Sequence, residues 1–247
     1  MKKAEKYRQV LADLEDWEPY LLAESGLPGP RANLELVQVV ADMGDQVLFD
    51  RLLAHGPTEA PVNTPDEFLA LCGVVGLGKL LAAGQTSELD RLKEYANDPR
   101  WRMREGVCMA LQRYGQQDLE GLTGAMEKWS SGTLLERRAA ACALCHPEML
   151  RDQAFAKRVL RLLNEITSTI LVEPDRSREA FKSLRKGLGY CWSVAIAAFP
   201  EEGKPVFETW LLSQDKDVRW IMKENLRKAR LKRMDAEWLE SCKELIG

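Results

Sequence analysis

Apolar residues recur along this 247-residue chain at the spacing of one face of an α-helix, and the pattern repeats about every 34 residues. One reference column runs through the repeats at intervals of 34, 33, 33, 48 and 34 residues: Val37, Leu71, Arg104, Arg137, Arg185 and Arg219. The positions one before, three after and six after each column member are apolar, with two polar exceptions, Glu136 and Asn225. The pattern therefore predicts six helices, each with one buried stripe.

Each of these helices is followed by a break and then by a second amphipathic helix. Gly and Pro mark the breaks, as at Gly56-Pro57 and Phe199-Pro200. The second helices are predicted at residues 46–54, 87–96, 118–129, 148–171, 204–212 and 235–246. Two lengthened helices, 148–171 and 176–199, account for the single 48-residue interval, and no segment is predicted to be a strand.

A helix pair that recurs six times buries its apolar stripe against its neighbours in the chain. The predicted fold class is therefore all-α, an α-solenoid of about six antiparallel helix pairs with an N-terminal capping helix at residues 2–24. The predicted organisation is a capping helix and Pro/Gly turn at residues 1–32, then one continuous repeat array at residues 33–247.

One segment carries a family resemblance. Residues 98–111 read Asp-Pro-Arg-Trp-Arg-Met-Arg-Glu-Gly-Val-Cys-Met-Ala-Leu. They resemble the first half of a HEAT repeat, which reads roughly D-P-x-x-x-V-R-x-x-A-x-x-A-L, and residues 137–144 and 217–219 are similar fragments. The resemblance implies an armadillo-type superhelix that acts as a scaffold for proteins or, less often, for nucleic acids.

A narrower resemblance concerns the HEAT-like DNA alkylation repair glycosylases. The chain has a Pro/Gly turn at residues 26–31 after its first helix, Trp101 with Glu105 four residues later, and Arg137-Arg138 one repeat further on. It departs from the family in the spacing of the turn, in carrying Glu where the family has Asp, and in two arginines between Trp101 and Glu105.

This second resemblance implies a DNA-binding protein of the alkylation repair type. In it, Trp101 and Trp220 would stack on bases and Glu105 would stabilise positive charge on the sugar. Phosphates would be bound by arginines one or more repeats away: Arg137, Arg138 and Arg219.

Each candidate residue also has a purely structural interpretation. Glu105 and Arg138 occupy one column in adjacent repeats, so an ion pair between them explains both without catalysis. The column arginines, among them Arg104, either bond the adjacent loop or form a phosphate-binding ladder. The two tryptophans either pack against neighbouring helices or present a stacking surface, and Arg31 belongs either to a rigid linker or to an anion site at the helix start that Asn33 is expected to cap.

Charge is unevenly distributed along the chain. Of the 35 basic and 38 acidic residues, 9 and 16 lie in residues 1–96, which leaves 26 basic and 22 acidic residues in the remainder. The densest basic cluster spans residues 219–233 and includes Arg227, Lys228 and Arg230, with Glu224 as its one acid. This cluster is either a solvated helix end or a surface for an acidic partner.

Other classes of function find little support in the sequence. The chain has two histidines and no P-loop, Rossmann or zinc-ligand motif, so neither a metal nor a cofactor is expected. Its six cysteines lie mostly among apolar residues and are expected to be reduced and packed. No apolar run approaches the ~20 residues of a membrane span, and no signal peptide is evident, so a cytoplasmic location without membrane partners is expected.

Two functions follow from these observations. The first is a non-catalytic HEAT-like scaffold that binds a macromolecular partner on its concave face, with a protein as the favoured partner and a nucleic acid as a possible one. The alternative is the DNA-binding protein of the alkylation repair type described above.

Overall fold

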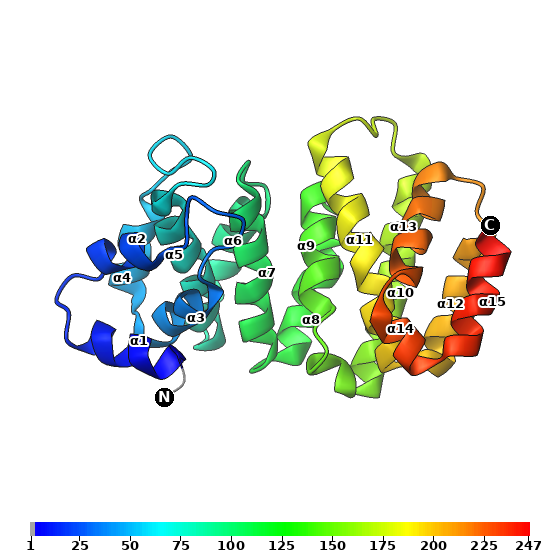
Figure 1. Ribbon diagram of the computed structural model, residues 1–247, viewed down its shortest axis with the longest axis horizontal. Coiled ribbons are helices and arrows are strands. Elements are labelled where there is room, and N and C mark those ends of the chain that lie inside the picture. The colour runs from blue at the N-terminus through cyan, green and yellow to red at the C-terminus, as the bar shows by residue number, and fades with distance from the viewer. Residues whose placement is uncertain (1–2) are drawn as a thin grey trace. The chain divides into compact units, whose positions relative to one another are not determined.

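The computed structural model describes residues 3–247, and in this range the chain is α-helical with no strand (Figure 1). The chain divides into two compact units, Met1–Asp118 (unit 1) and Leu119–Gly247 (unit 2). Together they hold fifteen α-helices and one short 3-10 helix among the described residues. The prediction of an all-α fold is therefore confirmed.

Unit 1 is built around a helix that is buried on nearly all sides. Its helices are α1 Lys3–Ala12, α2 Glu18–Glu24, α3 Leu34–Met43, α4 Gln46–Leu53, α5 Pro65–Ala82, α6 Glu88–Ala96 and α7 Trp101–Gly115. The central helix is α5, which packs against α2, α3, α4, α6 and α7. Its segment from Phe68 to Gly78 has no charged residue, so this part of the helix loses no hydration of charge on burial.

Unit 2 has the corresponding arrangement around α11. Its α-helices are α8 Leu119–Trp129, α9 Leu134–Leu144, α10 Gln153–Val172, α11 Glu179–Ala198, α12 Pro200–Leu211, α13 Lys216–Leu226, α14 Ala229–Met234 and α15 Ala236–Ile246, with the 3-10 helix η1 at Met149–Arg151. Helix α11 packs against α9 on one flank and α13 on the other, and α10, α12 and α14 also contact it. Its fully buried Trp192 donates an indole N–H to Thr167 Oγ1 of α10, at 3.0 Å.

The predicted helix pairs match the observed element order. The first helices of the six pairs are α3, α5, α7, α9, α11 and α13, and the second helices are α4, α6, α8, α10, α12 and α15. The three predicted stripe positions are buried in every first helix, except at Met43, which is half-buried. Within each unit these helices contact their neighbours in chain order, whereas the superhelix predicted from the repeat would span both units and stays a prediction.

Two local predictions differ from the structure. The single helix predicted at residues 2–24 is two helices, α1 and α2, because Pro19 in the first turn of α2 has no N–H to donate and blocks continuation from the preceding turn. Residue 2 of that prediction, and residue 1 of the predicted N-terminal segment 1–32, lie outside the described residues. The sequence pattern also missed α14, a short helix inside the basic cluster. The boundary predicted at residue 32 lies inside unit 1 and stays a prediction.

Candidate functional site

The residues singled out from the sequence are divided between the two units. Arg31, Trp101, Arg104 and Glu105 lie in unit 1, and the remainder lie in unit 2: Arg137, Arg138, Arg219, Trp220, Arg227, Lys228 and Arg230. The ion pair predicted between Glu105 and Arg138 would join the two units, and it stays a prediction.

In unit 1, Trp101 is the first residue of α7 and its side chain is 44% exposed. The guanidinium of Arg102 lies over its indole ring, 4.4 Å from the ring centroid. Glu105 follows one turn later and is also exposed. Helix α7 therefore presents an aromatic ring and a carboxylate on one exposed face.

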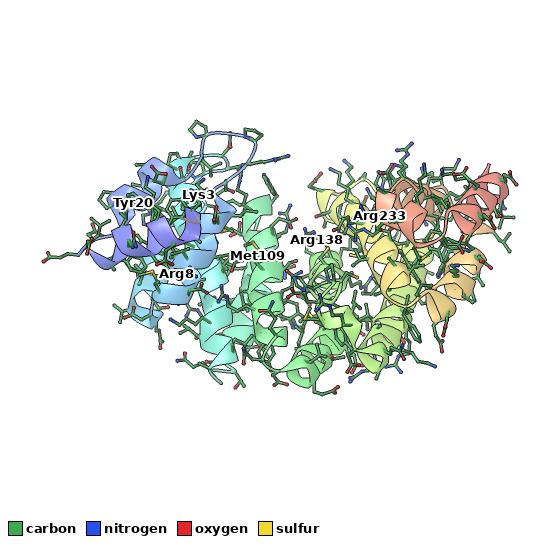
Figure 2. All side chains as sticks on the ribbon, turned by 60° about the horizontal axis from the view of Figure 1, so that its bottom comes forward. Lys3, Arg8, Tyr20, Met109, Arg138 and Arg233 are labelled. Atoms are coloured by element: carbon green, nitrogen blue, oxygen red, sulfur yellow. The ribbon has the colours of Figure 1, made fainter. Side chains whose placement is uncertain are left out.

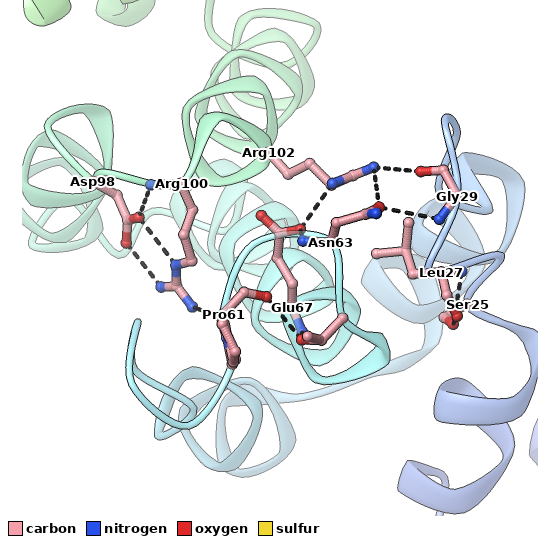
Figure 3. A network of polar contacts seen from close by, with 11 residues as sticks. Ser25, Leu27, Gly29, Pro61, Asn63, Glu67, Asp98, Arg100 and Arg102 are labelled. Atoms are coloured by element: carbon pink, nitrogen blue, oxygen red, sulfur yellow. Dashed lines mark hydrogen bonds and ion pairs between the residues drawn. The ribbon is translucent and has the colours of Figure 1, made fainter. Parts of the chain in front are cut away.

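Arg102 has a structural role beneath that ring (Figure 3). It is buried, and its Nη1 pairs with the fully buried Glu67 Oε2 at 2.9 Å. Its Nη2 donates to Gly29 O at 3.0 Å, and the backbone N–H of Gly29 in turn donates to Asn63 Oδ1. The Pro/Gly turn is thus anchored to α7 and to the segment before α5.

Arg104 and Arg31 sit in different surroundings. Arg104 is buried and its Nη1 donates to the carbonyls of Asp98 and Pro99, so this arginine bonds the loop before its own helix. Arg31 is exposed beside a depression of about 530 Å³ that Glu24 and Glu35 also line. Asn33 accepts a hydrogen bond from the Leu36 N–H, which confirms the cap predicted for α3.

In unit 2, three candidate arginines are buried or half-buried: Arg137, Arg138 and Arg219. Arg138 is buried, and the buried Nε of Arg137 has no hydrogen-bond partner among residues 3–247. Arg219 donates to the Ile246 carbonyl, and Lys223 Nζ donates to Gly247 O at 2.6 Å. These last two cations tie α13 to the end of α15.

Trp220 contacts Arg185, a member of the reference column of the repeat. The guanidinium of Arg185 on α11 lies 4.5 Å from the centroid of the Trp220 ring. The far edge of that ring rests on Gly189 of α11, where an added Cβ would lie 3.2 Å from the indole. A pocket of about 430 Å³ opens beside the ring and is lined by Arg176, Ser177, Arg185, Lys216, Asp217 and Trp220.

Two carboxylates fix the arginines of this pocket. Asp217 accepts from Arg185 Nη1 at 2.5 Å and from Arg176 Nη1 at 3.0 Å, and Asp215 accepts from Arg176 Nη1 at 2.7 Å. Burial alone would raise the pKa of Asp215. Hydrogen bonds from Arg176 and from backbone N–H groups at the start of α13 outweigh burial, so the pKa lies below its ordinary value of 3.8. Both carboxylates therefore hold Arg176 and Arg185 in place, and each carboxylate is paired with at least one arginine.

A second stack of the same kind lies further along α11. Tyr190 is 46% exposed, and the guanidinium of Arg230 on α14 lies 4.4 Å from its ring centroid while donating to its hydroxyl at 2.7 Å. Exposed lysines flank both stacks, at Lys182 and Lys186 on α11 and at Lys216 on α13. None of these three lysines has an ion-pair partner among the described residues.

We call this surface of unit 2 the basic-aromatic face and define it by eight residues: Lys182, Arg185, Lys186, Tyr190, Lys216, Trp220, Arg227 and Arg230. Sequence reasoning identified Trp220, Arg227 and Arg230 as candidates, included Arg185 among the column arginines of a possible phosphate-binding ladder, and missed the other four. A signal for three of them was present, since 182, 186 and 190 are spaced four residues apart and share one face of a helix.

The basic-aromatic face lies in the unit that has a positive net charge. Unit 1 holds 13 basic and 19 acidic residues, whereas unit 2 holds 22 and 19. Acids near the face are Asp215 and Asp217, which pair with Arg176 and Arg185, Glu179 at the start of α11, and Glu224, which pairs with both Arg227 and Lys228. The side chains of unit 2 appear in Figure 2, where Arg233 marks the basic end of α14. Excess positive charge therefore lies in the unit that carries the two arginine-aromatic stacks.

Comparisons with protein-family models, with curated proteins and with solved structures yield no match to this chain. Within residues 3–247, no three His, Cys, Asp or Glu side chains are grouped so as to hold a metal ion. No helix in the same range has the length and apolar character to cross a membrane.

Proposed function

We propose that this protein is a HEAT-like helical-repeat protein that binds a nucleic acid through the basic-aromatic face of unit 2. The observation that carries the proposal is the pairing of two aromatic rings, the exposed Tyr190 and the half-buried Trp220, with arginines on one surface that also presents unpaired lysines. Cations bind phosphates in register along a strand, and flat rings stack on bases.

This surface favours a nucleic acid over the protein partner that the resemblance to scaffolds suggested. An acidic polypeptide has carboxylates for the lysines but no bases for the rings. A nucleic acid uses both groups at once, because each nucleotide has a phosphate and a flat base. Arg185 and Arg230 are held over their rings by Asp217 and by the Tyr190 hydroxyl, so the stacks exist before any ligand binds.

Fluorescence anisotropy with labelled single-stranded and duplex DNA of equal length tests the proposal. We expect binding that weakens linearly on a logarithmic salt scale, with a slope of about −0.7 to −0.9 for each phosphate contacted. Lys186→Ala should reduce that slope by about 1. Lys157→Ala is the matched control, because Lys157 is an exposed lysine of α10 that pairs with Glu202, and it should leave the slope unchanged.

The aromatic contribution is measured with Trp220→Ala and Trp220→Phe on the single strand. Loss of one stacked base costs about 1–3 kcal/mol, so we expect Trp220→Ala to weaken binding by about 5- to 150-fold and Trp220→Phe to retain most of it. Helicity by circular dichroism checks that both variants fold. Absence of DNA binding at low salt, or equal competition by polyglutamate, would reject a nucleic acid as the partner.

A second candidate function, the alkylation repair type, is favoured by the exposed Trp101 and Glu105 one turn apart on α7. It is tested in the same preparation with methylated duplex DNA. Release of 7-methylguanine that Glu105→Gln abolishes would support it, and absence of release would leave the binding function alone.

A further inference from the structure

Two cysteine thiols meet where α9 packs on α11. Cys191 donates a hydrogen bond to Cys142, with the two Sγ atoms 3.8 Å apart although the residues are 49 positions apart in the chain. No cysteine among the described residues is in a disulfide, and Cys142 is half-exposed whereas Cys191 is buried. An oxidant can therefore reach one member of the pair and not the other.

The two helices approach each other closely at this point. Gly187 of α11 lies opposite Cys142, and a Cβ added there would lie 3.1 Å from Cys142 Sγ. Small residues also surround Cys142 on α9, at Ala139, Ala140, Ala141 and Ala143. A disulfide needs Cα atoms within about 7 Å and closes its sulfurs to about 2.05 Å. The two sulfurs, 3.8 Å apart, would have to approach by about 1.8 Å to form that bond.

The surroundings of the other cysteines differ. Burial raises the pKa of the Cys72 thiol well above its usual range and raises that of Cys242 to about 11, so both stay protonated and unreactive. Cys145 is three residues from Cys142, in a C-x-x-C spacing, but it is buried at the end of α9. Arg138, one turn before Cys142, packs against the same Gly187, so a cation shares the helix face of Cys142.

We propose that Cys142 and Cys191 are a redox pair that forms a reversible disulfide between α9 and α11 in the presence of a hydroperoxide. Cys142 attacks the peroxide, the O–O bond breaks, an S–O bond forms and one water leaves. The Cys191 thiol then attacks Cys142 Sγ, the S–O bond breaks, and the departing hydroxyl takes the Cys191 proton as a second water. In sum, two thiols and hydrogen peroxide give one disulfide and two waters.

The inference is independent of the proposed function and is tested on the full chain. The protein is treated with hydrogen peroxide, its remaining thiols are alkylated, and intact mass and tryptic peptides are measured. We expect two of the six cysteines to escape alkylation, the mass to fall by two hydrogen atoms before alkylation, and dithiothreitol to restore all six. The cross-link should join residues 139–151 to residues 187–216, because trypsin does not cleave between Lys204 and Pro205.

The first of these peptides contains both Cys142 and Cys145, so serine variants assign the link. Cys142→Ser and Cys191→Ser should abolish it, and Cys145→Ser, the matched control, should retain it. Fragmentation of the wild-type peptide between residues 142 and 145 gives the same answer if a variant fails to fold. A link between Cys142 and Cys145, oxidation of Cys142 without any link, or six alkylated thiols after treatment would each overturn the proposal.

Discussion

At the scale of single residues, a polar side chain in an apolar position is tolerated when its hydrogen bonds are complete. Asn225 occupies a stripe position that is apolar in the other five repeats, and it is fully buried. Its amide donates to the carbonyls of Leu188 and Ile221, and its oxygen accepts from the Ser193 N–H at 2.8 Å. An exception in the sequence pattern thus becomes a bond between α13 and α11.

The buried pair of Glu67 and Arg102 gives a prediction at this scale. Removal of one partner leaves a buried charge uncompensated, so Arg102→Met should reduce the free energy of unfolding by about 3–5 kcal/mol. The matched control is Arg8→Met, which removes an exposed ion pair with Asp42 and should cost about 0–1 kcal/mol. Urea unfolding of both variants measures the difference, and equal losses would contradict a special role for the buried pair.

The candidate site was only partly visible in single residues of the sequence. Trp220 was noticed in the sequence because it directly follows Arg219 of the reference column, so that a basic and an aromatic residue lie side by side. The sequence did not reveal that Arg185 lies over that ring, since the contact depends on how α11 and α13 pack. Nor did it reveal that Arg102 points inward, because its partner Glu67 lies 35 residues away in another helix.

At the scale of helices, the sequence predicted the elements well and their ends less well. Every predicted helix of the six pairs is present, because periodic apolar spacing over ten or more residues is a strong signal. The start of α10 was placed too early because residues 149–151 form a 3-10 turn, after which Asp152 caps the α-helix. Helix α14 was missed because six residues are too few to show a period.

Glycines in two helices give a matched pair of predictions. A Cβ at Gly78 of α5 would lie 2.5 Å from Ala110 O, so Gly78→Ala must separate α5 from α7 and should cost about 1–3 kcal/mol. A Cβ at Gly124 of α8 meets no atom within 4 Å, so Gly124→Ala should stabilise the protein by about 0.5–1 kcal/mol. Chemical denaturation measures both, and stabilisation by Gly78→Ala would show that the helix contact is looser than described.

At the scale of the whole molecule, the helices of each unit pack against one another in the order in which they follow along the chain. Within each unit the first helices of successive pairs pack against one another, as in an array where each repeat rests on its neighbours. The curvature and the groove of a solenoid depend on how the units are joined. The periodicity of apolar residues in the sequence does not encode that junction. The all-α fold class was predictable from the sequence, and the surface that we propose for binding was predictable only in part.

If each repeat packs only against its neighbours, a destabilising substitution should loosen only the repeats next to it. Phe49 of α4 is fully buried against α5, and Phe49→Ala should cost about 3–5 kcal/mol through the cavity it leaves. In an array this loss is transmitted between neighbouring repeats only, so amide hydrogen exchange should accelerate in α3 to α6 and remain unchanged in α11 and α13. Equal acceleration in both units would indicate one cooperative core instead.

The anchor between Arg102 and Gly29 has a consequence for the order of folding during synthesis. The ribosome makes Gly29 well before Arg102, which follows 73 positions later. The turn at residues 26–31 therefore has no such anchor while α3 to α6 are being made, and it acquires one when α7 emerges. Unit 1 reaches its final form late in its own translation, and nascent chains that stop before α7 should expose this turn to proteases.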